Sequence, residues 1–331
     1  MEKEQNVDIV VTWVDGSDEK WQNEFNKFNY VESWVPLEPE RYRSSDNLLG
    51  LWLKGVKKYA KWVSKIYVIV DRLNWHNQIE VGNGVEVVFH DEFIPEKYLP
   101  TFNSNVIEMN IHRIQGLSEN FILFNDDCFV TDYISKEDFF DEKGRPVDTD
   151  AIFPIMTTDD YGFTLLNNLV LINQAKKMTE YKRKFLKRNW NNITDTRVLR
   201  SIIINALLPN FHGWQDEHMP IAYKKTTFNE VWDVFSRPIA QQQVRKIRTM
   251  GDVSHLLCRY WQLVNFNYKS RKFGVLGEFV KMNPSSEQYD FESALYSKNN
   301  KIICVNDREM DSAVAEKAFN KIEIILTEYY T

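Results

Sequence analysis

The stretch NFILFNDDCFV, Asn120 to Val130, places three polar residues in a row directly after an apolar run. The apolar run is typical of a buried strand, and Asn125, Asp126 and Asp127 follow it. Adjacent carboxylates are a common way to hold a divalent cation, and oxygen ligands suit Mg²⁺ or Mn²⁺. An Asp-Asp pair is a weak motif by itself, because the same residues favour turns. The stretch therefore predicts either a turn or a metal site at Asp126 and Asp127.

A histidine beside carboxylates is a second candidate for chemistry. His218 follows Asp216 and Glu217 in the loop-like stretch GWQDEHMPIAY. A neighbouring carboxylate can orient a histidine and raise its basicity, as a general base requires. His112 and His255 lie instead in helical patterns, where a lone histidine is more often structural. His218 is therefore the predicted general base, with a structural role as the alternative.

Three arginines precede predicted helices. Arg41 and Arg43 stand in ERYRSSDN, and Arg248 stands in VRKIRTMGDVSHLL. Free N–H groups at the start of a helix can bind phosphate together with a nearby arginine. For each of these arginines, a surface ion pair is the alternative. Acids for a metal, arginines for phosphates and a histidine for protons together describe phosphoryl-transfer chemistry.

The composition argues against several other classes. A net charge of -6 over 331 residues lacks the basic surplus of nucleic-acid binders, so no nucleic-acid partner is expected. The sequence has no P-loop, GxGxxG, HExxH or GxSxG motif. Its three cysteines show no CxxC spacing, which is typical of reduced thiols in a cytoplasmic protein. No stretch resembles a signal peptide or a membrane span, so we expect a soluble protein, at most bound to a membrane surface.

The elements that would position these residues alternate along the first half of the chain. Strands are predicted at 7–14, 64–71, 84–93 and 120–127, with helices at 44–63 and 104–117. This alternation predicts a parallel sheet, in which ligands bind beyond the carboxyl ends of the strands. The polar residues at these predicted ends are Asp15, Asp71, His90 with Asp91, and Asp126 with Asp127.

The second half of the chain is predicted to be mainly helical, with a candidate strand from Ala151 to Met156. We expect a single catalytic α/β domain over residues 1–331. It would carry a mainly helical insertion at about 160–215 and a C-terminal strand-helix extension at about 285–331. A basic run from Lys176 to Arg188 favours a solvated helix face, with contact to an anionic substrate or lipid headgroups as the alternative.

Four blocks together cover about half of the chain: VDIVVTWVDGSD, the long block from RYRSSDNLL to FNDDCFV, DEHMPIAYKKTTFNEVW, and IRTMGDVSHLLCRYWQL. These blocks resemble the Stealth family of sugar-1-phosphate transferases. This family includes bacterial capsule and cell-wall polysaccharide phosphotransferases and the catalytic part of the lysosomal-enzyme GlcNAc-1-phosphotransferase.

The resemblance implies a glycosyltransferase-A-like, Rossmann-like α/β fold with a mostly parallel sheet and a helical insertion. It implies transfer of a sugar 1-phosphate from a nucleotide sugar, expected to be a UDP-sugar, to a hydroxyl of a glycan acceptor. A nucleoside monophosphate would be released, in the synthesis of a bacterial surface polysaccharide. The acceptor could be lipid-linked, which would bring a cytoplasmic enzyme to the inner face of the membrane.

Residue roles follow from the same resemblance. Asp127 with Asp126 would form the Mg²⁺ or Mn²⁺ and diphosphate site, with Asp127 favoured as the direct ligand. His218 would act as the base on the acceptor hydroxyl. The residues that would stabilise charge on the transferring phosphate are Arg248, with Arg41 or Arg43. Those implied in the nucleotide and phosphate pocket are Trp13, Asp15, and, in the TFNSN loop, Asn103 and Asn105.

Two other functions are left open by the sequence. One is an ordinary metal-dependent glycosyltransferase, which breaks the sugar–oxygen bond and releases a nucleoside diphosphate. The other is a sugar-binding module without catalytic activity. The identity of the sugar and the oligomeric state are not predicted.

Overall fold

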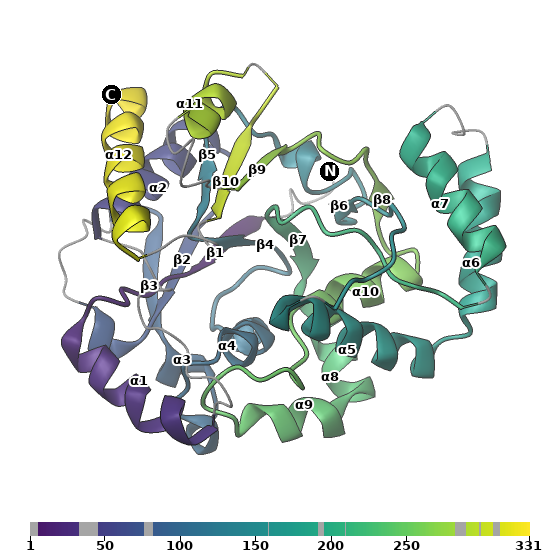
Figure 1. Cartoon of the computed structure of the whole chain (residues 1–331), viewed down its shortest axis with the longest axis horizontal. Helices are drawn as coiled ribbons and strands as arrows, with labels where there is room; N and C mark the ends of the chain where they lie inside the picture. Colours follow the sequence, from purple (N-terminus) through teal and green to yellow (C-terminus); the bar gives the residue numbers. More distant parts are fainter. Residues whose placement is uncertain are drawn as a thin grey trace.

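The computed structural model describes residues 6–32, 46–75, 82–157, 159–190, 195–208, 210–281, 289–297, 299–306 and 312–331. Within these residues a central five-stranded sheet has the order β3-β2-β1-β4-β7 (Figure 1). Its strands are β1 (Val7–Thr12), β2 (Ile66–Val70), β3 (Val85–Phe89), β4 (Asn120–Asn125) and β7 (Ile221–Lys224). The first four run parallel and β7 is antiparallel at the edge, which confirms the predicted mostly parallel α/β fold.

Both faces of this sheet are buried, as is usual for parallel strands. In β1, Ile9 and Val11 enter one apolar cluster and Val10 enters another on the opposite face, because side chains alternate along a strand. The first face is covered by α2 (Asp46–Tyr59), and α12 (Ser312–Tyr330) packs on α2. The second is covered by α4 (Ser104–Asn110), α8 (Lys225–Val234) and α10 (Leu256–Val264). The result is a layered sheet with helices on both sides.

The register brings the carboxyl ends of the parallel strands to one edge. Thr12, at the end of β1, pairs with Ile69 of β2 and with Asn125 of β4. On the far side of β2, Val70 pairs with Phe89 of β3. The polar residues that follow each strand therefore lie along the edge where ligands of such sheets bind.

Smaller elements surround the central sheet. A three-stranded sheet contains β5 (Cys128–Val130), β10 (Ile302–Asn306) and β9 (Gly277–Lys281), and a two-stranded one contains β6 (Val147–Asp148) and β8 (Lys269–Ser270). The remaining α-helices of the described residues are α1 (Glu19–Glu32), α3 (His90–Phe93), α5 (Asp160–Ala175), α6 (Met178–Asn189), α7 (Thr196–Leu207), α9 (Ser236–Gln243) and α11 (Tyr289–Leu295).

Helices α5, α6 and α7 occupy the range of the expected helical insertion, and β10 and α12 occupy that of the C-terminal extension. Figure 1 shows α6 and α7 on the opposite side of the molecule from α12. The division of the chain into body, insertion and extension stays a prediction. In the described part of the chain, no helix combines the length and apolar character needed to cross a membrane.

Several predicted elements are wrong in extent or type. The helix expected at 44–63 ends at Tyr59, and the strands expected at 7–14 and 120–127 end at Thr12 and Asn125. The strand expected at 84–93 ends at Phe89, where the Glu92 carboxylate accepts a hydrogen bond from the Phe89 N–H and starts α3. The strand expected from Ala151 to Met156 is reduced to one bridge between Ile152 and Trp214. The helix expected at 104–117 ends at Asn110, whose side-chain amide donates to the Val106 carbonyl, and a 3₁₀ turn follows.

Two glycines of α2 test the packing of α12. A methyl group at Gly55 would lie 2.6 Å from the Tyr330 hydroxyl and 2.8 Å from the Val130 carbonyl, whereas one at Gly50 would meet no atom within 4 Å. Gly50→Ala should stabilise the fold by up to about 1 kcal/mol through helix propensity. Gly55→Ala should destabilise it by about 1–3 kcal/mol, because overpacking displaces Tyr330 from its hydrogen bond to Val130.

Urea unfolding of the two variants and the parent chain measures both effects. Gly50→Ala is the matched control, because it has the same change in helix propensity without the clash. Equal stability changes in the two variants would contradict the packing of Tyr330 against α2.

Candidate active site

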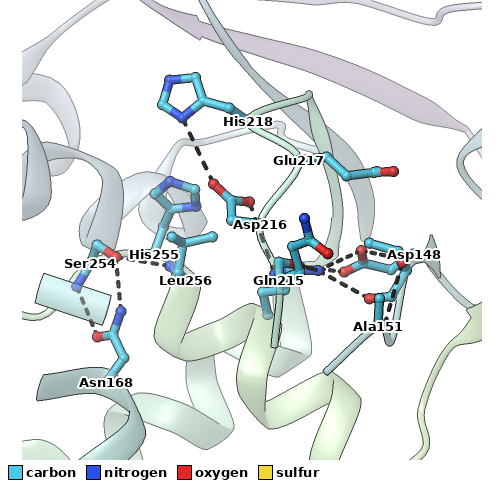
Figure 2. A network of polar contacts seen from close by, with 12 residues as sticks. Asp148, Ala151, Asn168, Gln215, Asp216, Glu217, His218, Ser254, His255 and Leu256 are labelled. Carbon is cyan, nitrogen blue, oxygen red and sulfur yellow. Dashed lines mark hydrogen bonds and ion pairs between the residues drawn. The ribbon is translucent and has the colours of Figure 1, made fainter. Parts of the chain in front are cut away.

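His218 stands in the loop that leads into β7, with a backbone φ of 56°. A positive φ is uncommon outside glycine and marks a residue whose position is imposed by its surroundings. Its Nδ1 lies 3.7 Å from an Asp216 carboxylate oxygen (Figure 2). Its ring makes edge contacts with Phe279 of β9 and Tyr161 of α5, at centroid distances of 4.9 and 5.8 Å. The imidazole is therefore held between distant parts of the chain.

Asp216 is the group that orients His218. Burial disfavours its charge, but the contact with the His218 imidazole and the positive charge of Arg259 outweigh burial and lower the pKa of Asp216 well below its usual range. The Tyr161 hydroxyl also donates to this carboxylate. Asp216 is therefore an anion at neutral pH, and it favours a proton on the Nδ1 atom of His218.

Arg259 fixes the loop that carries both residues. Its guanidinium is 1% exposed and donates from Nε and Nη2 to the two oxygens of Asp148, at 2.8 and 3.1 Å. The same Nη2 reaches the carbonyls of Thr149 and Gln215, and Nη1 lies 4.0 Å from Asp216. Arg259 was not among the residues predicted from the sequence, although a single arginine inside the apolar stretch LLCRYWQLV is itself a signal of a buried ion pair.

Asp127 lies close to His218. It follows β4, and its Oδ1 accepts a hydrogen bond from the Cys128 thiol at 3.4 Å. Burial raises the pKa of Asp127, and the charge of His218 opposes this shift. The Cys128 thiol also lies 3.8 Å from the main-chain carbonyl of His218. The structure thus brings together the two residues that the sequence predicted as base and metal ligand, at the carboxyl edge of the sheet.

The donor atoms around Asp127 decide which cation would fit. Among the described residues, the one group of three or more potential ligand side chains is Asp127 with Cys128 and Cys304. Burial raises the pKa of Cys128 to about 11, so this residue is a thiol at neutral pH, and metals bind thiolates. Mg²⁺ commonly uses one or two carboxylates, with phosphate oxygens and water as its other ligands. Asp127 and its neighbour Asp126 therefore fit a Mg²⁺ ion only together with a bound diphosphate.

A second polar cluster joins Arg248 to this site. Glu108 of α4 lies 3.7 Å from Nε2 of His255, whose Nδ1 is 2.8 Å from the Tyr223 hydroxyl. Burial raises the pKa of Glu108 to about 7, and the charge of Arg248 partly offsets the rise. Burial lowers the pKa of His255 to about 4, although Asp216 opposes this shift. Arg248 therefore interacts with Glu108, and Glu108 and Asp216 both interact with His255.

The TFNSN loop holds the Arg248 segment in place. The Asn103 side chain accepts from the N–H of Asn105 at the start of α4. Its Nδ2 donates to the Ile247 carbonyl at 3.1 Å and to Asp252 at 2.7 Å, so it spans both sides of Arg248. Asn103 is fully buried and acts here as a positioning residue. Direct contact of Asn103 or Asn105 with a nucleotide stays a prediction.

The remaining predicted site residues are Trp13, Asp15, Arg41 and Arg43. Trp13 is buried with its ring at 89° to that of Trp75, and Asp15 accepts from the N–H and hydroxyl of Ser17 at 2.9 and 2.6 Å. Both follow β1 at the same sheet edge as Asp127, and their binding role stays a prediction. Arg41 and Arg43 lie outside the described residues.

A mostly parallel sheet with carboxylates, a histidine and an arginine at its carboxyl edge defines an α/β enzyme site suited to phosphoryl transfer. Comparison with known proteins agrees with this class. Stealth protein conserved region 1 matches residues 5–29, and Stealth protein conserved region 2 matches residues 41–148. The last two blocks of the sequence resemblance lie beyond these matched regions.

Several curated relatives match nearly the whole chain. Capsular polysaccharide phosphotransferase WcwK of Streptococcus pneumoniae is 32% identical, over 92% of this chain and 91% of its own length. Exopolysaccharide phosphotransferase cps2G of Lactiplantibacillus plantarum is 33% identical, over 93% and 89%. Receptor polysaccharide phosphotransferase WefC of Streptococcus oralis is 31% identical, over 91% and 90%. The chain therefore belongs to the Stealth family, and the predicted enzyme class, a phosphotransferase, is confirmed.

A likeness among solved structures is more remote. The apo WbbM bifunctional glycosyltransferase matches 99% of this chain and 52% of its own at 10% sequence identity, with a TM-score of 0.37. A score this low carries no argument about the site.

The buried Glu108 carboxyl predicts a pH dependence of stability. Its pKa rises from 4.5 to about 7 on folding, so its stabilising contribution is complete below about pH 4.5 and is lost as the pH rises through about 7. Glu108→Gln keeps the neutral form at every pH. Relative to this variant, the parent chain should lose up to about 3 kcal/mol of stability between about pH 4 and about pH 8.

Denaturant unfolding of both proteins across this range measures the difference. Glu96→Gln, at an exposed carboxylate, is the control and should follow the parent chain. A stability gap between parent and Glu108→Gln that does not vary with pH would contradict the buried, protonated carboxyl.

Proposed function

We propose that this protein transfers a sugar 1-phosphate from a nucleotide sugar, a UDP-sugar in the first instance, to a hydroxyl of a glycan acceptor. The acceptor oxygen forms a bond to the β-phosphorus, and the bond between that phosphorus and the bridging oxygen to the α-phosphate breaks. The leaving group is a nucleoside monophosphate, and the sugar keeps its bond to oxygen. The product is a phosphodiester within a surface polysaccharide.

The observation that carries this proposal is the Asp216–His218 pair beside Asp127. An alcohol is a weak nucleophile at neutral pH, and a positioned base accelerates its attack by roughly 10²–10⁴-fold. With Nδ1 directed at the Asp216 anion, the Nε2 atom of His218 is the one suited to take the hydroxyl proton. Asp216 then stabilises the imidazolium that forms.

The negative charge of the diphosphate is the second requirement. When bound, Mg²⁺ or Mn²⁺ would supply charge neutralisation at the diphosphate, and Asp127 with Asp126 would hold it. Arg248 would stabilise charge on the transferring phosphoryl group, from a segment that Asn103 and Asp252 hold in place. Trp13 and Asp15, at the end of β1, would contact the nucleotide.

A lipid-linked acceptor glycan would be presented at the cytoplasmic face of the membrane, so we also propose that the enzyme contacts this face. Support comes from exposed cations of α6, including Arg183 and Lys187. Other members of the basic run have partners within the protein. Lys176 lies 4.1 Å from the ring centroid of Trp261, and Lys182 donates to the Leu208 carbonyl at 2.6 Å.

The released nucleotide tests the proposal. The full-length protein is incubated with Mg²⁺, a panel of UDP-sugars and a glycan acceptor, and nucleotides are separated by chromatography. Release of UMP that depends on acceptor is the expected result. Release of UDP would instead establish an ordinary glycosyltransferase, and binding of a UDP-sugar without any turnover would favour a sugar-binding module.

Replacement of His218 tests the base. His218→Asn suits the left-handed backbone at this position, so it should leave the stability intact while it lowers turnover by roughly 10²–10⁴-fold. Affinity for the nucleotide sugar, measured by calorimetry, should change little. His212→Asn, six residues away in the same loop, is the control and should keep the parent rate.

A different kinetic pattern would contradict the base role. If His218→Asn lost nucleotide-sugar affinity but kept its rate at donor saturation, His218 would be a binding residue instead.

A further inference from the structure

A separate cavity of about 330 Å³ lies beside the loop that carries His218. Its walls come from residues 149–151, the C-terminal end of α6, the start of α7 and residues 270–273. This volume is at the lower end of the about 300–1,000 Å³ typical of small-molecule sites. It is suited to a single sugar unit and is small for a nucleotide sugar.

The polar lining has an excess of hydrogen-bond donors. The two carboxylates are already engaged: Asp150 accepts from the hydroxyls of Tyr268 and Ser270, and Asp195 accepts from the N–H groups at the start of α7. By contrast, within the described structure the buried Nη1 of Arg197 and Nε of Arg271 have no hydrogen-bond partner. Buried guanidinium donors without partners are unfavourable, so they favour an anionic ligand.

Lys272 adds a third cation to the lining, and two aromatic rings complete it. The guanidinium of Arg197 stacks on the ring of Phe273 at 4.0 Å, and Phe185 lies on the α6 side. Stacking fixes the plane of the Arg197 guanidinium, which suits two-point binding of a phosphate. Carbohydrates also present C–H faces that pack on aromatic rings. The lining therefore combines features for a sugar ring and for a phosphate.

The cavity is joined to the candidate base by one ion pair. Arg271 contacts Glu217 with both of its terminal nitrogens, at 2.7 and 2.6 Å, and Glu217 precedes His218 in the chain. The Glu217 carboxylate also accepts from the N–H of Gly274 at 2.6 Å. A ligand in the cavity would therefore lie next to Arg271 and its partner Glu217, one residue along the chain from the candidate base.

We propose that this cavity binds a phosphate-bearing sugar unit of the acceptor glycan, a short distance from the hydroxyl that reacts. The identity of this ligand rests on the proposed function, because phosphotransfer to a growing glycan leaves phosphodiesters in the chain that is extended next. The site would allow the enzyme to select an acceptor that already carries a phosphate. Arg197 and Lys272 would contact the phosphate, Arg271 would stay paired with Glu217 at the edge of the site, and Phe273 would contact the sugar.

Direct binding tests the site without any need for turnover. The probes are the 1-phosphates of glucose, galactose and N-acetylglucosamine, with neutral methyl α-glucoside as their matched control. Calorimetry on the full chain, in the presence of saturating UMP to occupy the donor site, should show binding of at least one sugar phosphate. The neutral glucoside should bind at least about tenfold more weakly, as expected for loss of a charge-assisted contact.

Variants assign the binding to the cavity. Arg197→Gln and Lys272→Gln should each weaken the sugar phosphate by about tenfold, and Lys272→Gln tests an exposed side chain whose loss is compatible with folding. The matched controls are Arg237→Gln, exposed on α9, and Lys269→Gln, exposed in β8, both outside the lining. Neither control should alter the affinity.

Three results would overturn the inference: no sugar phosphate binds, the neutral glucoside binds equally well, or the two cavity variants bind like the parent. A methyl diester of the bound sugar phosphate then separates the sources of the phosphate. Retained affinity is expected for an internal phosphodiester, whereas loss of affinity would overturn the assignment to the acceptor chain. If UDP rather than UMP proves to be the product, the proposed function fails, yet the binding result for the cavity stands.

Discussion

The buried guanidinium of Arg259 is the contact on which the candidate active site depends. It joins α10 to Asp148 of β6 and to the main chain of Gln215, which are far apart in the sequence. A buried arginine is costly unless its charge is compensated, so the loop from Gln215 to His218 is held close to it. The same charge keeps Asp216 ionised, and the orientation of His218 follows from that anion.

The sheet supplies the other half of the arrangement. Four parallel strands in register place Asp15, Asp71 and Asp127 along one edge, while β7 runs antiparallel and returns the His218 loop to that edge. Asp127 and His218 are then close in space. The thiol of Cys128, the residue after Asp127, contacts the His218 carbonyl although the two residues are 90 positions apart in the sequence. Burial disfavours the charge of each carboxylate of the site, but the partners of the carboxylates differ. It raises the pKa of Asp127 and Glu108, whereas hydrogen bonding and charge keep the pKa of Asp216 low.

Much of this architecture could be predicted from local sequence. Apolar runs with β-branched residues identified β1, β2 and β4, and the carboxylates after them indicated the functional edge. His218 was found because its carboxylate partner lies two residues away. Arg259 was missed because its main partner, Asp148, is 111 residues away, and no spacing rule connects them. The contacts of Asn103 with the Arg248 segment were not predicted either, because these residues are also far apart in the sequence.

Transfer of a sugar 1-phosphate requires that the bond between the β-phosphorus and the bridging oxygen breaks while the sugar–oxygen bond survives. A UDP-sugar with oxygen-18 between the sugar carbon and the β-phosphorus tests it directly, with ³¹P NMR of the products. We expect the label to stay in the glycan product, next to a phosphodiester phosphorus, and UMP to be unlabelled. Label recovered in a released UDP would contradict it, because the sugar–oxygen bond would then have been the one cleaved.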